Sequence, residues 1–279
     1  EQQKRHFHEE GYLVLPRFWS REQTCQEMRS KMKDIIQEMD LDEARTVFTT
    51  YEEKHTGDDY FLGSSDKIRF FWEERAFDEQ GSFKQDRMLC INKVGHAIHD
   101  LDPIFRKHSY EPRVGKLCRE LGLSQPLAVQ SMYIFKQPRI GGEVTPHQDG
   151  SFLYTEPQSV IGLWWALEDC RLGNGCLWAV PGSHKTGVHR RFKRSDRGGC
   201  EFDPVEAENY DISGAISLEV DAGALVVLHH SLVHYSEQNT SEKSRHAYSI
   251  HVVEGASGVH YPADNWLQRP EESPFQQLP

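Results

Sequence analysis

The chain has 279 residues, of which 37% are hydrophobic and 27% charged, and its formal net charge is −11. This composition is typical of a soluble globular protein, and no apolar run approaches the ~20 residues of a membrane-spanning helix. The negative charge disfavours contact with a nucleic-acid backbone or an anionic membrane, so we expect neither as a partner.

Several segments before residue 125 predict helices. Residues 1–10 have a helical pattern and are followed by a short apolar run at 12–18. The segment 20–40 starts with Ser20, which has a glutamine three residues later in capping-box spacing, and its apolar residues recur at helical intervals. A further helix is predicted at 112–122, which has proline in its first turn and glycine at its end.

After about residue 127 the pattern changes to short runs rich in β-branched and aromatic residues, separated by turn residues. These predicted strands are 127–135, 159–169, 175–182, 223–236 and 245–253. Several are apolar on both faces, as expected for strands enclosed by another sheet or by helices. The sequence therefore predicts a mainly β fold with an α cover, and an antiparallel jelly roll is the leading candidate.

No internal repeat, low-complexity tract or long linker interrupts the sequence. A single domain over 1–279 is the simplest account. We expect an N-terminal helical cover over about 1–125 and a β-barrel core over about 126–270. Nothing in the sequence reports on assembly, so a monomer is the default expectation.

Six cysteines are scattered along the chain without a C-x-x-C pair. We predict reduced thiols in a cytosol-like compartment, although an even number leaves disulfides as an alternative. The chain begins at Glu1 without the features of a signal peptide, and the missing methionine suggests a trimmed N-terminus. A cytoplasmic location is expected, and a peroxisomal one stays an alternative.

The triplet His147-Gln148-Asp149 is a candidate metal chelate. About one H-x-D match is expected by chance in a chain of this composition, so the triplet alone does not indicate a metal site and its structural context has to be considered. In an extended chain residues i and i+2 point to the same side, so His147 and Asp149 could reach one ion together. The similar spacing of His8 and Glu10 lies in a helical pattern, where such residues do not face each other.

A third ligand is available from the late run 223–236, which contains His229, His230 and His234. Two imidazoles and one carboxylate with open positions suit a non-haem Fe(II) oxygenase. Zinc also binds histidine and carboxylate ligands, so it is the alternative ion. For His229 and His230 the alternative is a plain core or turn position.

Arg245 opens the predicted strand 245–253. A guanidinium inside a barrel needs a partner, because an unpaired buried charge is costly. A dicarboxylate cosubstrate would supply one through a bidentate contact, with the Ser236 hydroxyl as a further donor. The alternative is a bridge to a carboxylate of the protein itself, such as Glu254.

Five segments, taken in order, carry a family resemblance: TPHQDGSFLYTEP, GLWWALED, NGCLWAVPGSHKTG, LVHYSEQNTSEKSRHAYSIHVVE and DNWLQR. From about Phe7 to Arg269 the chain resembles the phytanoyl-CoA dioxygenase family. The resemblance implies a double-stranded β-helix, a cupin-like jelly roll, that binds Fe(II) and 2-oxoglutarate. An ordered set of long motifs is far more specific than a single H-x-D.

The resemblance also implies roles for individual residues. His147, Asp149 and His234 match the metal ligands of the family. Arg245 and Ser236 match the residues that hold the far carboxylate of 2-oxoglutarate.

Other positions match the family less specifically. Lys93, Met132 and Trp164 match further cosubstrate contacts, and plain core packing is the alternative for Met132 and Trp164. One departure is His230, where the family usually has glycine or another small residue. We expect His230 to be a packing residue and treat His184, in the motif PGSHKTG, as structural.

The function implied by the resemblance is a dioxygenase that hydroxylates a small organic or acyl-type substrate and releases succinate and CO2. It requires Fe(II), 2-oxoglutarate and O2, and ascorbate is expected to help in vitro. The carboxylate of Asp149 favours hydroxylation over halogenation, because related halogenases lack it. The alternatives are a barrel that binds metal and 2-oxoglutarate without turnover, as a sensor or scaffold, and a zinc hydrolase.

Two further segments bear on the substrate. The basic stretch 184–197 could meet phosphates, although a solvated surface is the expected role of such a charge run. The polar stretches 50–71 and 77–88 are predicted to form part of a lid over the barrel.

Overall fold

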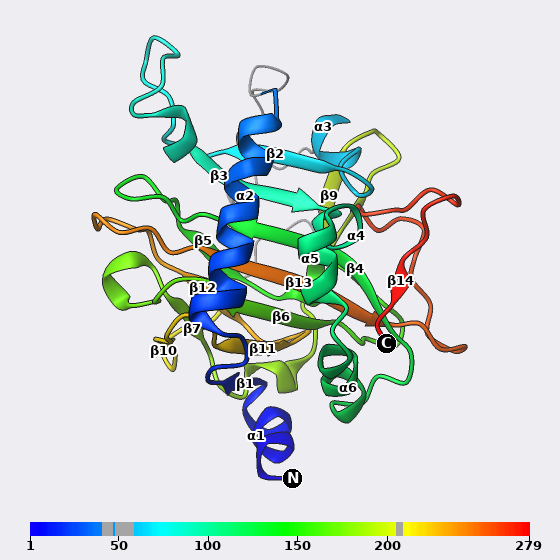
Figure 1. Ribbon diagram of the computed structural model, residues 1–279. Helices are drawn as coiled ribbons and strands as arrows, with labels where there is room; N and C mark the ends of the chain where they lie inside the picture. The colour runs from blue at the N-terminus through cyan, green and yellow to red at the C-terminus, as the bar shows by residue number, and fades with distance from the viewer. Residues whose placement is uncertain (41–46, 48–58, 205–208) are drawn as a thin grey trace.

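The structure, a computed structural model, describes residues 1–40, 47, 59–204 and 209–279 (Figure 1). The helices are α1 (Gln2–Glu10), α2 (Gln26–Glu38), α3 (Asp59–Leu62), α4 (Ile98–Leu101), α5 (Pro103–Ser109), α6 (Pro112–Glu120) and α7 (Asp149–Phe152). Shorter helical turns are the π-helix η1 (Arg21–Cys25) and the 3-10 helices η3 (Arg87–Leu89), η4 (Leu172–Asn174) and η5 (Ser183–Thr186).

A large antiparallel sheet forms the centre of the molecule. Its strands lie in the order β1, β11, β6, β13, β4, β3, β2, and β14 pairs with β4. Their bounds are β1 (Tyr12–Leu15), β2 (Ile68–Trp72), β3 (Ile91–His96), β4 (Pro126–Ile134), β6 (Ile161–Ala166), β11 (Leu225–His229), β13 (Ala247–Glu254) and β14 (Gln276–Gln277).

A smaller sheet contains β10, β7, β12 and β5 in that order, and β8 pairs with β9 in a separate hairpin. The bounds are β5 (Val144–His147), β7 (Leu177–Ala179), β8 (Arg191–Arg194), β9 (Cys200–Asp203), β10 (Ile216–Leu218) and β12 (His234–Ser236). The two antiparallel sheets confirm the predicted jelly roll with helices at its N-terminal side.

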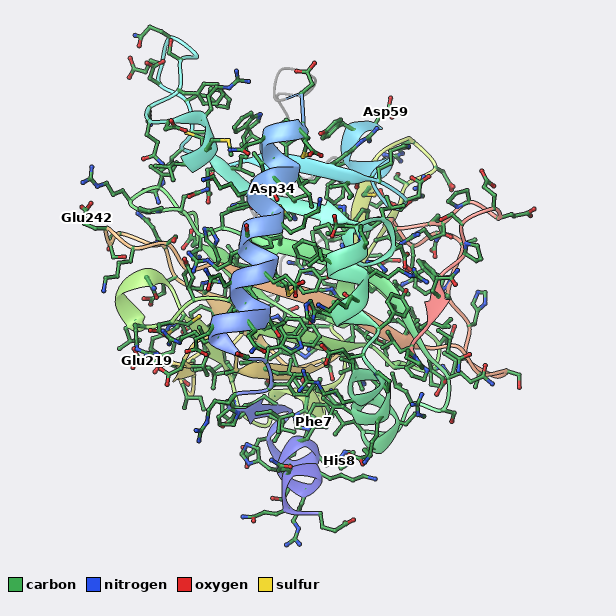
Figure 2. The ribbon with its side chains drawn as sticks, in the orientation of Figure 1. Phe7, His8, Asp34, Asp59, Glu219 and Glu242 are labelled. Carbon is green, nitrogen blue, oxygen red and sulfur yellow. The ribbon has the colours of Figure 1, made fainter. Side chains whose placement is uncertain are left out.

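Helices α2 and α5 cross the outer face of the large sheet (Figure 1). Met28 and Met32 of α2 are buried in the same core as Trp165 and Tyr248 of the sheet. The solvent side of α2 carries exposed residues such as Asp34 (Figure 2). The 3.6-residue period of the apolar positions in segment 20–40 therefore places them on the buried face of α2.

The N-terminal part differs from the predicted helical cover in one respect. The apolar run 12–18 provides β1, which pairs with β11, and β2 and β3 extend the sheet beyond β4. Residues 68–71, which were predicted to be part of a lid, instead belong to β2 at the edge of the large sheet. The division of the chain at about residue 125 stays a prediction.

The late run 223–236 is not one strand. It divides into β11, in the large sheet, and β12, in the small one. The turn between them is closed by a hydrogen bond from the Leu232 amide to the His229 carbonyl, 2.9 Å long. His230 therefore lies in this turn and His234 in β12, so the two do not belong to one strand.

The six cysteines are free and buried, which contradicts the disulfide alternative. Burial raises the pKa of the Cys118 and Cys170 thiols to about 12, so these two thiols stay protonated. Among the described residues, every helix is too short or too polar to cross a membrane.

Candidate metal and cosubstrate site

His147 and Asp149 lie where β5 meets α7. Strand β5 ends at His147, and Asp149 is the first residue of α7. Gln148 between them points the opposite way, and its Nε2 donates to the carbonyls of Ser231 and Gly187 at 2.7 and 2.8 Å. His147 and Asp149 therefore lie on one side of the chain and Gln148 on the other, as predicted, although α7 begins at Asp149.

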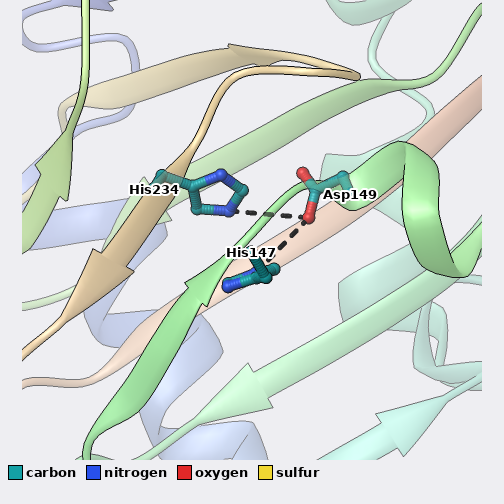
Figure 3. A group of neighbouring side chains, drawn as sticks. All are labelled: His147, Asp149 and His234. Carbon is teal, nitrogen blue, oxygen red and sulfur yellow. Dashed lines mark ion pairs between the residues drawn. The ribbon is translucent and has the colours of Figure 1, made fainter. Parts of the chain in front are cut away.

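His234 reaches the same place through strand pairing. Strand β12 runs antiparallel to β5 with His234 opposite His147, and the two ring centroids are 4.2 Å apart. Figure 3 shows His147, Asp149 and His234 turned toward one another. We call these three residues the His–Asp–His group.

The distances within the His–Asp–His group suit one metal ion. Asp149 Oδ1 lies 3.8 Å from His147 Nε2 and 3.5 Å from His234 Nε2. Two atoms bound to one ion at about 2.1 Å each are at most about 4.2 Å apart. Among the described residues this is the only group of three or more histidine, cysteine or acidic side chains that could hold an ion.

Both imidazoles are held in the tautomer that a metal requires. Nδ1 of His147 lies 2.8 Å from the Thr145 carbonyl, and Nδ1 of His234 lies 3.0 Å from that of Leu232. A carbonyl can only accept, so each Nδ1 carries the proton and each Nε2 presents a lone pair.

Burial and neighbouring charges keep Asp149 ionised and His147 neutral, the protonation states in which these side chains bind a metal ion. Burial, with a smaller contribution from His234, lowers the pKa of His147 to about 4. Burial opposes ionisation of Asp149, but the nearby His251 and His234 outweigh it and hold the pKa of Asp149 below its usual range. Near neutral pH His147 is therefore neutral and Asp149 ionised, as metal ligands must be.

A cavity of about 200 Å³ opens beside the His–Asp–His group. One water needs only about 10–15 Å³ of such space, so the cavity holds far more than a metal ion. The structure brings every residue predicted for the site to its wall: His147, Asp149, His234, Arg245, Ser236, Lys93, Met132 and Trp164.

Arg245 and Ser236 lie at one end of this cavity. The Arg245 side chain is 1% exposed, and its Nε donates to the Gly175 carbonyl at 3.0 Å. Its Nη1 has no hydrogen-bond partner among the described residues. Glu254 instead accepts from the amides of Ser124 and Gln125, so the alternative of an Arg245–Glu254 bridge is wrong.

Lys136 joins the same end and was missed in the sequence. Its Nζ donates to Ser236 Oγ at 2.9 Å and to the Gly142 carbonyl at 2.6 Å. Burial and the charge of Arg245 lower the pKa of Lys136 well below its ordinary value. Two neighbouring buried cations point to an anion that binds between them.

Trp164, Met132 and Lys93 line the cavity between the two sheets. Arg245 Cζ lies 5.2 Å from the Trp164 ring, so the indole packs against the guanidinium. Lys93 Nζ lies 3.9 Å from Met132 Sδ, and burial lowers the pKa of Lys93 to about 7.

His230 stands apart from the His–Asp–His group. Its ring is tilted against that of His229, with centroids 3.9 Å apart, and the His184 ring meets that of His229 edge-on at 4.7 Å. These three residues, the histidine cluster, do not line the cavity. The His230 side chain takes no part in the cavity wall, and its backbone carbonyl accepts from the Gly150 amide at 2.7 Å.

Two cations of the basic stretch 184–197 are paired with carboxylates of the protein. Lys193 forms an ion pair with Asp203, and Arg191 forms one with Asp264 at 2.7 Å. Arg190 is part of the cavity wall. Of the predicted lid, residues 50–58 lie outside the described residues, and Phe61 in the described part lines the cavity.

His251 is the second functional candidate that the sequence analysis missed. Its Nε2 lies 3.3 Å from Asp149 Oδ2, and it lines the cavity. A signal was present, because residues alternate along β13 from Arg245 through Ser249 to His251. Lys136 gave no such signal, because it follows the end of β4.

The chain is similar to known proteins over most of its length. Residues 7–247 match the family model described as Phytanoyl-CoA dioxygenase (PhyH). A "Phytanoyl-CoA dioxygenase" of Arabidopsis thaliana is 50% identical over 94% of this chain and 91% of its own length. A "Phytanoyl-CoA dioxygenase domain-containing protein 1" of Bos taurus is 49% identical over 98% of this chain and 96% of its own.

A solved structure shares the fold. It is the epimerase SnoN in complex with Fe3+, alpha ketoglutarate and nogalamycin RO, with a TM-score of 0.64 at 13% identity. The match covers 100% of this chain and 98% of that one. The family model spans most of the sequence and the relatives are alike over almost their full length, so this chain belongs to the phytanoyl-CoA dioxygenase family.

Proposed function

We propose that this protein is an Fe(II)- and 2-oxoglutarate-dependent dioxygenase that hydroxylates a small organic or acyl-type substrate. The observation that carries the proposal is the convergence of His147, Asp149 and His234 beside a cavity that ends at Arg245. Family membership and the SnoN complex, which holds iron and alpha ketoglutarate (2-oxoglutarate), support the same reading.

The residues present fit an iron ion. Two neutral imidazoles and one carboxylate are the donor set of non-haem Fe(II) oxygenases. The tautomers fixed by Thr145 and Leu232 aim both Nε2 lone pairs into the site. His147, Asp149 and His234 would hold the ion.

The other end of the cavity fits the far carboxylate of 2-oxoglutarate. Arg245 Nη1 is a buried donor without a partner among the described residues, and a carboxylate would satisfy it. Because Lys136 donates to Ser236 Oγ, the hydroxyl proton of Ser236 remains free to donate into the cavity. Arg245, Ser236 and Lys136 would together hold the carboxylate.

The chain's part in the reaction is placement. When bound, Fe(II) and 2-oxoglutarate would activate O2 for oxidation of a C–H bond, with release of succinate and CO2. Trp164 packs on Arg245 and limits the directions the guanidinium can take. Met132 and Lys93 line the same wall and would contact the cosubstrate from the side. A buried pocket of this kind holds the reacting groups in a fixed relative position and keeps water away from them.

The direct test is an assay with Fe(II), ascorbate and 2-oxoglutarate, in which succinate is measured with and without a metabolite extract. Succinate and a mass gain of one oxygen in an extract component are expected. A visible charge-transfer band should also appear when Fe(II) and 2-oxoglutarate are mixed with the protein anaerobically. Binding with no oxygen consumption under any condition would instead favour the sensor or scaffold, and absence of both band and turnover would refute the proposal.

A further inference from the structure

The two carboxylate oxygens of Asp149 face different neighbours. Oδ1 is turned to the His–Asp–His group, at 3.8 Å from His147 Nε2 and 3.5 Å from His234 Nε2. Oδ2 is turned away from those two rings, toward His251 Nε2 at 3.3 Å. The carboxylate therefore divides its oxygens between a potential ion and a third imidazole.

Gly162 forms the other wall around Oδ2. It lies directly opposite His251 in the pairing of β6 with β13. A Cβ atom added at Gly162 would come within 2.6 Å of Oδ2, closer than real Cβ atoms approach anything. An alanine at this position would therefore force the Asp149 carboxylate to shift.

Oδ2 and His251 both lack a hydrogen-bond partner within the described part of the chain, although both are buried. The exposed fractions are 7% for Asp149 and 7% for His251, and neither Oδ2 nor His251 Nδ1 forms a hydrogen bond. His251 Nε2 lies 3.3 Å from Oδ2, although the contact does not meet the geometry of a hydrogen bond. A small rotation of the imidazole would align it and satisfy the buried oxygen.

We infer that His251 and Gly162 form a slot that positions the Asp149 carboxylate, so that it offers only Oδ1 to a metal ion. This inference rests on the proposed function, because it assumes that the His–Asp–His group binds an ion. His251 donates its Nε2–H to Oδ2, and Gly162 leaves the room that the carboxylate needs. His251 is thus a positioning residue that acts through Asp149.

The test compares three variants with the parent protein by calorimetric titration with Co(II) and by the visible spectrum of bound Co(II), which depends on coordination number. His251→Phe keeps a ring and removes the donor, and it should weaken Co(II) binding about 10- to 100-fold, as loss of a partner outside the ligand set does. His251→Gln keeps an N–H donor, and it should restore most of the affinity and the parent spectrum. His230→Asn removes a buried imidazole outside the cavity and should change neither.

The outcomes separate the inference from the proposed function. If the parent protein does not bind Co(II), the metal site and this inference both fail. If the parent binds and His251→Phe binds equally well, the inference alone is wrong. Equal losses in His251→Phe and His251→Gln would also overturn it, because the donor would then be irrelevant.

A further variant tests the slot at Gly162, on the wall opposite His251. Gly162→Ala leaves His251 intact and places a methyl group against Oδ2. It should weaken Co(II) binding and alter the Co(II) spectrum while the circular dichroism stays that of the parent. A folded Gly162→Ala protein with unchanged affinity would contradict the slot, and this holds even if His251→Phe does not fold.

Discussion

The protein contains two close groups of histidines that differ in what surrounds them. In the His–Asp–His group, two Nε2 atoms converge on the carboxylate of Asp149 beside a cavity. In the histidine cluster, the rings of His184 and His230 both contact that of His229, which lies beside Phe7 of α1, labelled in Figure 2.

The comparison shows that proximity of imidazoles does not make a metal site. The cluster rings are about as close as the rings of His147 and His234, with centroids at 3.9 to 4.7 Å against 4.2 Å. The cluster has no carboxylate among its members, and it does not line the cavity beside the His–Asp–His group. His184 Nε2 lies 3.0 Å from the His8 carbonyl, so that nitrogen is used to hold α1 rather than an ion.

The largest effect should follow from removing the carboxylate. Asp149→Ala should lose metal binding by more than the ~10- to 100-fold typical of residues outside the ligand set, and succinate formation should disappear. His230→Asn, in the cluster, should bind Co(II) as the parent does. Calorimetric titration of both variants checks this, and retained turnover in Asp149→Ala would refute its ligand role.

A large but different effect is expected at the other end of the cavity. Arg245→Gln should weaken 2-oxoglutarate binding by about 2 to 5 kcal/mol, at least about 30-fold, because one partner of a buried charge pair is lost. Co(II) affinity without 2-oxoglutarate should stay unchanged, since Arg245 is not among the ligands. Titration of 2-oxoglutarate into the Co(II)-loaded protein measures this. A parent-like affinity would show that the anchor lies elsewhere.

Lys136 should contribute less than Arg245. Lys136→Met removes a charged donor near the carboxylate and should cost about 1.5 to 3 kcal/mol of 2-oxoglutarate binding. The same titration applies, with Lys136→Arg as the variant that keeps the charge. If Lys136→Met binds 2-oxoglutarate as tightly as the parent, Lys136 serves only to hold the Ser236 and Gly142 backbone region in place.

The smallest effect concerns pH and the histidine cluster. Burial, reinforced by neighbouring imidazoles, lowers the pKa of His229 to about 3 and that of His230 to about 4. The unfolded chain binds protons on these rings below about pH 6.5, whereas the folded chain does not until pH 3 to 4. The free energy of unfolding should therefore fall as the pH drops from 6.5 toward 4.

Thermal melts of the parent and His230→Asn between pH 7 and 4.5 test that expectation. The variant has one fewer buried imidazole, so its melting temperature should fall less steeply on acidification. An identical pH dependence in both proteins would show that His230 does not contribute to it.

The sequence alone determined the elements whose pattern is local. The helical spacing of Met28 and Met32 placed them on the buried face of α2, and the alternation around Gln148 put His147 and Asp149 on one side. Such patterns are readable because they depend on the backbone period of a single element. The family resemblance then indicated which distant residues belong with them.

The tertiary structure shows why His234, which the family resemblance indicated, is the histidine that joins the pair. Local reasoning left His229, His230 and His234 open, and the chain leaves the large sheet after His229 to place His234 opposite His147 in β12. Strand register brings Gly162 and His251 around Asp149 in the same way. Pairing between strands far apart in the sequence depends on the whole fold, which is why His251 and Lys136 were found only there.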